Sequence, residues 1–176
     1  MRAIHLFLWA TLFFACGSAV RARSAPAPRD VDRGIELYRN RDFAQAAAVL
    51  EDAAAASPRD ARAFIYLGLS RVELGRYGEA EAAFRKALEI DGNASLAHYG
   101  LGLALGYQGQ LDPAIGELQK AVDLDPKNAY AHYHLGLGLH RKGVKDRALL
   151  HLHRFLELAP DAPEAAQVRA LLSQIE

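Results

Sequence analysis

The chain has one cysteine in 176 residues, and this scarcity excludes several classes of protein. One thiol cannot build an internal disulfide framework, a multi-cysteine zinc site or an iron–sulfur site. Threonine occurs once, at Thr11, and the shortage of β-branched residues argues against a sheet protein. An excess of either charge is also missing, because 21 basic residues balance 21 acidic ones. The chain therefore lacks the basic footprint of a nucleic-acid-binding protein.

Alanine and leucine are the residues that the chain does have in excess. It contains 34 Ala and 26 Leu, which together make up about a third of the sequence. Both residue types strongly favour helices. We therefore expect an all-α chain.

The first 22 residues follow a different pattern from the rest. Arg2 precedes an apolar run from Leu6 to Ala15, and small residues and Arg21 follow. A charged start, a short apolar run and a small-residue exit are typical of an export signal. We predict a signal peptide at 1–22, a linker at 23–29 and a periplasmic or envelope-associated location. Removing 1–22 would leave 19 basic against 21 acidic residues.

The only cysteine, Cys16, lies where the apolar run ends. Residues 13–18 (FFACGS) resemble a bacterial lipobox, in which the thiol is lipidated and becomes the new N-terminus. Ala15 fits that pattern, whereas the two phenylalanines depart from it. Cleavage after Ala19 or Ala22 and an uncleaved membrane anchor are the alternatives. All three place the rest of the chain outside the cytoplasm.

The remainder of the chain repeats every 34 residues. Three copies occupy 61–94, 95–128 and 129–162, and a degenerate fourth precedes them at 27–60. The copies share a Leu-Gly pair, a central glycine and a later alanine at equal spacing. The matching residues are Leu67-Gly68, Leu101-Gly102 and Leu135-Gly136; Gly75, Gly109 and Gly143; and Ala80, Ala114 and Ala148. The first copy carries Gly34, Phe43, Ala46, Leu50, Ala53 and Pro58 in the same register.

Each copy has the pattern of two antiparallel helices. Apolar residues recur at spacings of three and four, which is helical periodicity. The central glycines supply a left-handed cap, and we expect Asp42, Asp112 and Asp146 to cap the second helices. We also expect the helical glycines Gly68, Gly102 and Gly136 to admit Ala80, Ala114 and Ala148 from the partner helix.

These copies resemble the tetratricopeptide repeat, whose pattern is a large residue, Leu-Gly, Tyr, Ala, Phe, Ala and a closing Pro. The resemblance covers 27–162 and implies an α-solenoid of four helix-turn-helix repeats. Departures include Arg33, which replaces the Leu before the first glycine, and His98 and His132 in the opening aromatic slot. Residues 163–176 carry Val168 and Leu172 on one face and predict a C-terminal capping helix.

The family resemblance implies that the first helix of each pair lines a concave groove. Small gaps for a partner side chain are expected at Gly100 and Gly106. The family's carboxylate clamp is absent from its slots, which argues against a receptor for acidic chaperone tails. An alternative is that most of the tyrosines only complete packing between repeats. The candidate partner-binding residues are Tyr38, Ile65, Tyr66, Leu69, Tyr99, Leu103, Tyr107, Tyr130, Tyr133, His134, Leu137, His140 and Arg141.

The histidines do not have the spacing of a metal site. His132/His134 and His151/His153 are two residues apart and so point to opposite sides of a helix. A set assembled between helices from His134, His140 and His151 is a weaker alternative. No nucleophile elbow, phosphate loop or zinc-protease motif is present. We expect no enzyme activity, no metal and no cofactor.

The sequence therefore predicts a non-enzymatic scaffold or adaptor of the cell envelope that binds a peptide or helix in its groove. The runner-up is a structural spacer or self-associating module, and a metal- or heme-handling protein comes third. The expected partners are other proteins, with a homodimer as an option. Nucleic acid is not expected, and membrane contact is expected only through a lipidated or uncleaved N-terminus.

Overall fold

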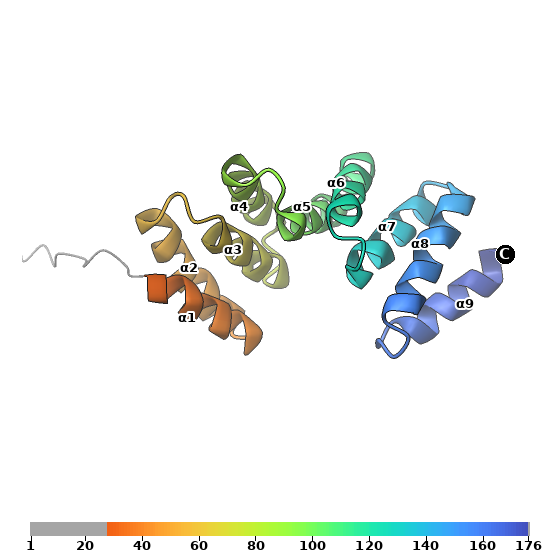
Figure 1. The fold of residues 1–176 in the computed structure, drawn as a ribbon, viewed down its shortest axis with the longest axis horizontal. Coiled ribbons are helices and arrows are strands. Elements are labelled where there is room, and N and C mark those ends of the chain that lie inside the picture. The colour runs from red at the N-terminus through yellow and green to blue at the C-terminus, as the bar shows by residue number, and fades with distance from the viewer. Residues whose placement is uncertain (1–27, 176) are drawn as a thin grey trace, which may run out of the picture.

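The computed structural model describes residues 28–175, which form nine helices and no strands (Figure 1). The predicted signal peptide and Cys16 lie outside the described residues, as does most of the expected linker. The last two linker residues belong instead to the first helix, because Pro28 is tolerated at a helix start. The helices are α1 (Pro28–Arg39), α2 (Phe43–Ala56), α3 (Ala61–Glu73), α4 (Tyr77–Ile90), α5 (Ser95–Tyr107), α6 (Leu111–Leu124), α7 (Ala129–Arg141), α8 (Lys145–Leu158) and α9 (Ala165–Ile175).

The helices are arranged as successive antiparallel pairs. Each 34-residue copy contains two of them, and the pairs follow one another in a row from α1 at one end to α9 at the other (Figure 1). Contacts join only neighbouring pairs, as expected for a one-dimensional repeat array. The all-α solenoid expected from the repeats is confirmed.

The turn inside each pair depends on one residue in the left-handed region. Gly75, Gly109 and Gly143 have φ angles of 73°, 80° and 81°, which confirms their predicted role as caps. The first pair has Arg41 in the same slot, and its φ is 63°. A side chain in this conformation is strained by roughly 1–2 kcal/mol, so the first turn is the least favourable of the four.

The predicted aspartate caps are correct at only one of three helices. Asp42 precedes α2 and accepts a hydrogen bond from the Gln45 amide at 3.4 Å. Asp112 and Asp146 are instead the second residues of α6 and α8, and the residues at the cap positions make no side-chain cap bond. Their carboxylates therefore act through the positive end of the helix dipole rather than as caps.

The helical glycines face a larger residue than expected. A Cβ on Gly68 would lie 2.7 Å from the Phe84 ring, and one on Gly102 would lie 2.7 Å from Leu118 Cγ. Gly136 faces Leu152 and Gly34 faces Leu50 in the same way. The expected partners Ala80 and Ala148 are not among these nearest neighbours; only the backbone oxygen of Ala114 is, 3.2 Å from the Gly102 position. Each glycine therefore makes room for a leucine or phenylalanine side chain.

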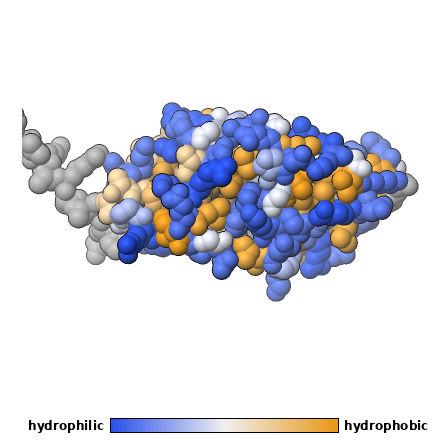
Figure 2. Space-filling view, turned by 90° about the horizontal axis from the view of Figure 1, so that it is seen from above, coloured by the Kyte–Doolittle hydropathy of each residue, from blue (hydrophilic) through white to orange (hydrophobic). Residues whose placement is uncertain are grey.

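Buried side chains fill the seam between each pair and the next. One cluster joins α1 to α4, a second joins α3 to α6, a third joins α6 to α8 and a fourth joins α8 to α9. The face seen in Figure 2 is largely hydrophilic, with apolar groups interspersed. Among residues 28–175, no helix combines the length and apolar character needed to cross a bilayer.

Helix α9 covers the last apolar face of the array. Its Val168 and Leu172 are buried against Leu152 and Phe155 of α8. Gln167, next to Val168, is exposed. A helix with this contact pattern is what a solenoid end requires.

Replacing Gly102 by leucine should destabilise the protein by roughly 1–3 kcal/mol, because the new side chain would overlap Leu118. Gly116→Ala is the matched control. Gly116 lies in α6 with open space around it, so alanine there should stabilise by roughly 0.5–1 kcal/mol. Urea unfolding of both variants measures the two effects. Unchanged stability of Gly102→Leu would contradict this account of the pairing.

A charge buried between α9 and α8 should detach α9 and expose the apolar face of α8 at the end of the array. Val168→Asp would bury a carboxylate against Phe155, so we expect a lower melting temperature and aggregation on warming. Gln167→Asp adds the same charge one residue earlier on the exposed face and should behave as the unmodified protein. Light scattering during thermal melts compares them. Equal behaviour of the two variants would show that α9 is not a cap.

Candidate functional site

A cleft opens where the third and fourth helix pairs meet, and we call it the α5–α7 cleft. It encloses about 310 Å³ between α5, α6 and α7. Six of the predicted groove residues line it, namely Leu103, Tyr107, Tyr133, His134, Leu137 and Arg141. The remaining lining residues are Gly102, Gly106, Leu111, Ala114, Ile115, Leu118 and Gly138.

Small residues create this cleft. Gly106 occupies the slot that holds Tyr38 in the first copy and Val72 in the second. A Cβ on Gly106 would have only Ala114 Cβ nearby, at 3.8 Å. Gly138 lets α7 approach α6, since a Cβ there would lie 3.1 Å from Ile115 Cγ1. The predicted gap at Gly106 is therefore present in the structure.

Aromatic rings form one wall of the cleft. The His134 ring lies 4.8 Å from that of Tyr133 and 5.9 Å from that of Tyr99, and Tyr133 also lies 5.0 Å from Phe155. Tyr107, whose side chain is 56% exposed, stacks on Tyr77 at 4.7 Å. These contacts hold the rings in fixed orientations, which lowers the entropy cost of binding a partner.

Burial keeps Tyr99, Tyr133 and His134 of this wall neutral at physiological pH. Burial lowers the pKa of His134 to about 4, against the opposing effect of the Glu164 carboxylate. Burial also raises the pKa of Tyr99 and Tyr133, so their hydroxyls stay protonated. The wall thus offers apolar ring faces, hydroxyl groups and a neutral imidazole, and Arg141 adds one cation at the rim. Such a surface suits apolar side chains and peptide groups.

Tyr130 lies beside this wall and links it to the C-terminal segment. Its hydroxyl donates to Glu164 Oε2 at 3.2 Å, and its ring lies 6.4 Å from that of Tyr133. His140 is half-buried on α7 and does not line the cleft.

Over the first two pairs most of the predicted groove residues are packed, although Tyr66 lines a separate hollow of about 370 Å³ between α1 and α3. Ile65 and Leu69 are each only 7% exposed and lie in the core, so they offer no surface to a partner. Tyr38 and Tyr66 pack against that core with their rings 5.6 Å apart. The predicted gap at Gly100 is also wrong, because the Phe84 ring fills that space. For Tyr38, Ile65 and Leu69 the packing alternative is the better description.

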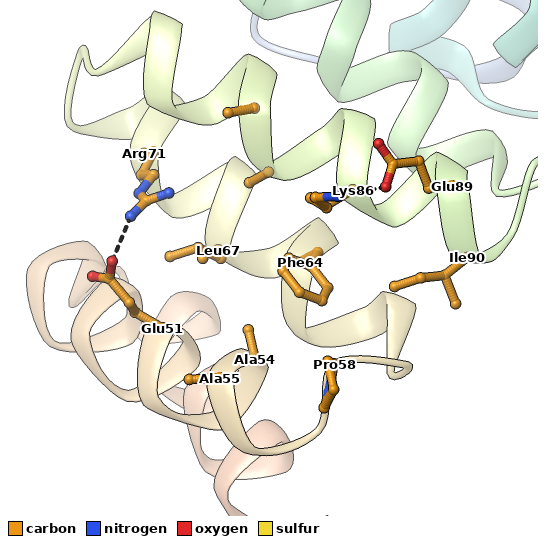
Figure 3. Close-up of a pocket in the computed structure, with 12 residues that line it drawn as sticks. Glu51, Ala54, Ala55, Pro58, Phe64, Leu67, Arg71, Lys86, Glu89 and Ile90 are labelled. Atoms are coloured by element: carbon orange, nitrogen blue, oxygen red, sulfur yellow. Dashed lines mark hydrogen bonds and ion pairs between the residues drawn. The ribbon is translucent and has the colours of Figure 1, made fainter.

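The sequence did not predict a second and larger cleft. It encloses about 530 Å³ between α2 and α4, with Phe64 and Leu67 of α3 on its floor (Figure 3). It exists because Ala54 and Ala83 occupy slots that hold Leu88 and Glu117 in the next copy. The small size of these two alanines was the signal that could have revealed it.

The charges at this second cleft already have partners. Arg71 contacts Glu51 at 3.1 Å and Lys86 contacts Glu89 at 2.6 Å (Figure 3). The rest of the lining is aliphatic apart from Phe64, and no tyrosine or histidine faces it. The α5–α7 cleft, which combines aromatic faces with hydroxyl groups, is therefore the stronger candidate site.

The described residues contain no group of three or more His, Cys, Asp or Glu side chains placed to hold a metal ion. His151, one of the three histidines considered for an interhelical metal set, lies instead against His132. Some ion pairs of the described residues join neighbouring helices, as Arg71–Glu51 does, and others lie within one helix, as Arg85–Glu81 does.

Known proteins resemble this chain in sequence and in structure. Family models described as tetratricopeptide repeat and as TPR repeat match residues 31–95 and 104–143, respectively. The crystal structure of a MamA protein has a TM-score of 0.69 at 25% identity and covers 84% of this chain and 80% of its own. MamA 41-end from Desulfovibrio magneticus RS-1 has a TM-score of 0.68 at 27% identity, with 81% of each chain covered.

The type III secretion translocator chaperone SycD of Yersinia enterocolitica is also similar. Its TM-score is 0.59 at 26% identity, over 64% of this chain and 80% of that one. No curated protein sequence matches. The 34-residue period, the paired helices and two matched stretches that together cover more than half of the sequence agree with one another. The chain belongs to the tetratricopeptide repeat family, whose members are interaction modules for other proteins.

Proposed function

We propose that this protein is a non-enzymatic scaffold of the cell envelope that binds a segment of a partner protein in the α5–α7 cleft. The observation that carries the proposal is the aromatic wall of Tyr107, Tyr133 and His134 facing a floor of glycines. Side chains of a partner enter the space above the glycines, and the tyrosine hydroxyls bond to its peptide groups. The envelope location rests on the export pattern of residues 1–22.

The size of the cleft agrees with a peptide ligand. A volume of about 310 Å³ accommodates a few apolar side chains rather than a whole folded domain. The cleft is open to solvent, so an extended strand or one face of a helix fits it. SycD, a type III secretion translocator chaperone that resembles this chain in fold, supports a role in binding another protein.

Removing two apolar contacts in the cleft should weaken peptide binding at least about tenfold, which corresponds to about 1.4 kcal/mol. We would select peptides from a random library on the purified protein and measure their affinity by fluorescence anisotropy. The test variant is Leu103→Ala with Tyr107→Ala, both in the cleft. The control is Leu124→Ala with Leu150→Ala, which removes exposed leucines outside it.

Equal affinity of the cleft variant and the unmodified protein would contradict the proposal. Sedimentation at two concentrations separates the self-association alternative. A dimer that forms with concentration and is lost in the cleft variant would mean that the cleft binds a second copy rather than another protein.

The export part of the proposal predicts a shortened or lipidated chain in cells. Intact mass of the protein recovered from the envelope of an expressing bacterium should correspond to cleavage after Ala19 or Ala22, or to lipidation at Cys16. A full-length mass starting at Met1, found in the cytoplasmic fraction, would contradict export while leaving the cleft untouched.

A further inference from the structure

Two of the three histidines of helix α7, His132 and His134, face opposite sides. His134 lies in the wall of the α5–α7 cleft, whereas His132 is buried in the seam between α7 and α8. There His132 meets His151 of α8, which is also buried, with their Nδ1 atoms 3.0 Å apart. The same helix therefore joins the candidate binding site to a buried pair of imidazoles.

The hydrogen bonds of this pair fix where its protons lie. His132 Nε2 is 3.2 Å from the Pro126 carbonyl oxygen, which can only accept, so Nε2 carries the hydrogen. Nδ1 of neutral His132 is then an acceptor, and the Nδ1–H of His151 donates to it. When both rings are protonated, two N–H groups point at each other and this hydrogen bond is lost.

The preceding copy holds a different pair in the same two slots. His98 Nδ1 lies 2.6 Å from Glu117 Oε2, and its Nε2 lies 3.0 Å from the Gly92 carbonyl oxygen. Both nitrogens of His98 face acceptors, so a protonated ring is satisfied there. Burial raises the pKa of Glu117, but hydrogen bonds from His98 and Lys120 outweigh burial and the net shift is downward. Replacing this glutamate by His151 in the last copy changes an acid-tolerant pair into an acid-sensitive one.

Charges around the pair partly cancel. Arg154 and Arg147 of α8 disfavour a second positive charge, and Glu157 of α8 favours it. Asp123 of α6 and Asp125 just after α6 favour it too. Helix α9 contributes Arg169 as its only titratable side chain, which donates to the Pro160 carbonyl oxygen at 2.9 Å.

Burial is the largest influence on both rings. It lowers the pKa of His132, and it lowers that of His151 to about 4. The unfolded chain, with histidine pKa values near 6.5, therefore binds more protons than the folded one between about pH 6.5 and pH 4. Stability of this seam is complete above that window and falls as the pH falls through it.

The seam lies at one end of the array, where opening costs less than in the middle. Pair α7–α8 has a full repeat on one side only, and α9 is its single neighbour on the other. Contact between α5 and α7 is also less extensive than between the corresponding helices of earlier pairs. If α7 separates from α8, Tyr133 and Leu137 lose the cluster that they pack against, and the cleft loses part of its wall.

We propose that the His132–His151 pair is an acid-sensitive latch, which opens the last repeat at mildly acidic pH and so releases the segment bound in the α5–α7 cleft. The latch itself is a property of the fold, whereas release of a partner rests on the proposed function.

The decisive variant is His151→Glu, which recreates the His98–Glu117 pairing in the last copy. We expect hydrogen exchange of the purified protein at pH 5, corrected for intrinsic rates, to increase in α7–α9 relative to pH 7 while α1–α6 stay protected. His151→Glu should abolish that increase. His153→Gln, which removes an exposed histidine two residues along α8, should keep it.

A uniform increase over α1–α6, or an equal increase in His151→Glu, would overturn the latch. Imidazole NMR titrations provide a second measurement that does not depend on the variants folding. Midpoints of His132 and His151 near 6.5 would also overturn it. Rings whose pKa is not lowered by burial would not weaken the contact between α7 and α8 as the pH falls.

Peptides selected on the protein at pH 7 test the link to binding. We expect roughly tenfold weaker binding at pH 5, with the loss removed by His151→Glu.

If His134→Gln removes the loss and His151→Glu does not, the sensor is the cleft histidine and the latch is wrong. If the latch opens but the variant Leu103→Ala with Tyr107→Ala binds normally at pH 7, the proposed function fails and release is refuted with it. If that variant loses binding at pH 7 but acid has no effect, only the latch fails.

Discussion

The contact between a helical glycine and a large apolar side chain of its partner helix determines most of this structure. It recurs four times, as Gly34 with Leu50, Gly68 with Phe84, Gly102 with Leu118 and Gly136 with Leu152. A glycine inside a helix costs about 1 kcal/mol relative to alanine, so the buried leucine or phenylalanine must offset that cost. The distance between the two helices of each pair follows from this contact, and the seams between pairs follow from that distance.

Differences in side-chain size between the otherwise similar helix pairs produce the clefts. All four pairs keep the glycine contact, but the slots around it hold residues of different size. The α2–α4 cleft is open because Ala54 and Ala83 are small, and the α5–α7 cleft is open because Gly106 replaces the Tyr38 or Val72 of earlier copies. A repeat protein can thus place a site at one chosen seam without changing its architecture.

The fold was predictable because its period is visible in the sequence, and the left-handed glycines followed from the same alignment. The glycine partner was misassigned because Ala80 and Phe84 lie one turn apart on the same face of α4, and spacing alone does not separate them.

The groove was predicted only in part. Ile65 and Tyr133 share a slot, yet Ile65 is covered by the neighbouring tyrosines and Tyr133 is not. Such coverage depends partly on a side chain of another copy, Tyr38, which a single-copy pattern does not reveal.

The central claim is that a partner segment occupies the α5–α7 cleft, and the glycine amides of the chain offer a direct measurement. Their resonances lie in a separate region of a ¹H–¹⁵N spectrum, and Gly102, Gly106 and Gly138 line the cleft while Gly34 and Gly68 lie in the earlier pairs. On titration with a peptide selected on the protein, the account predicts saturable shifts of the three cleft glycines and none of the other two. Shifts at Gly34 and Gly68, with the cleft glycines unchanged, would contradict it.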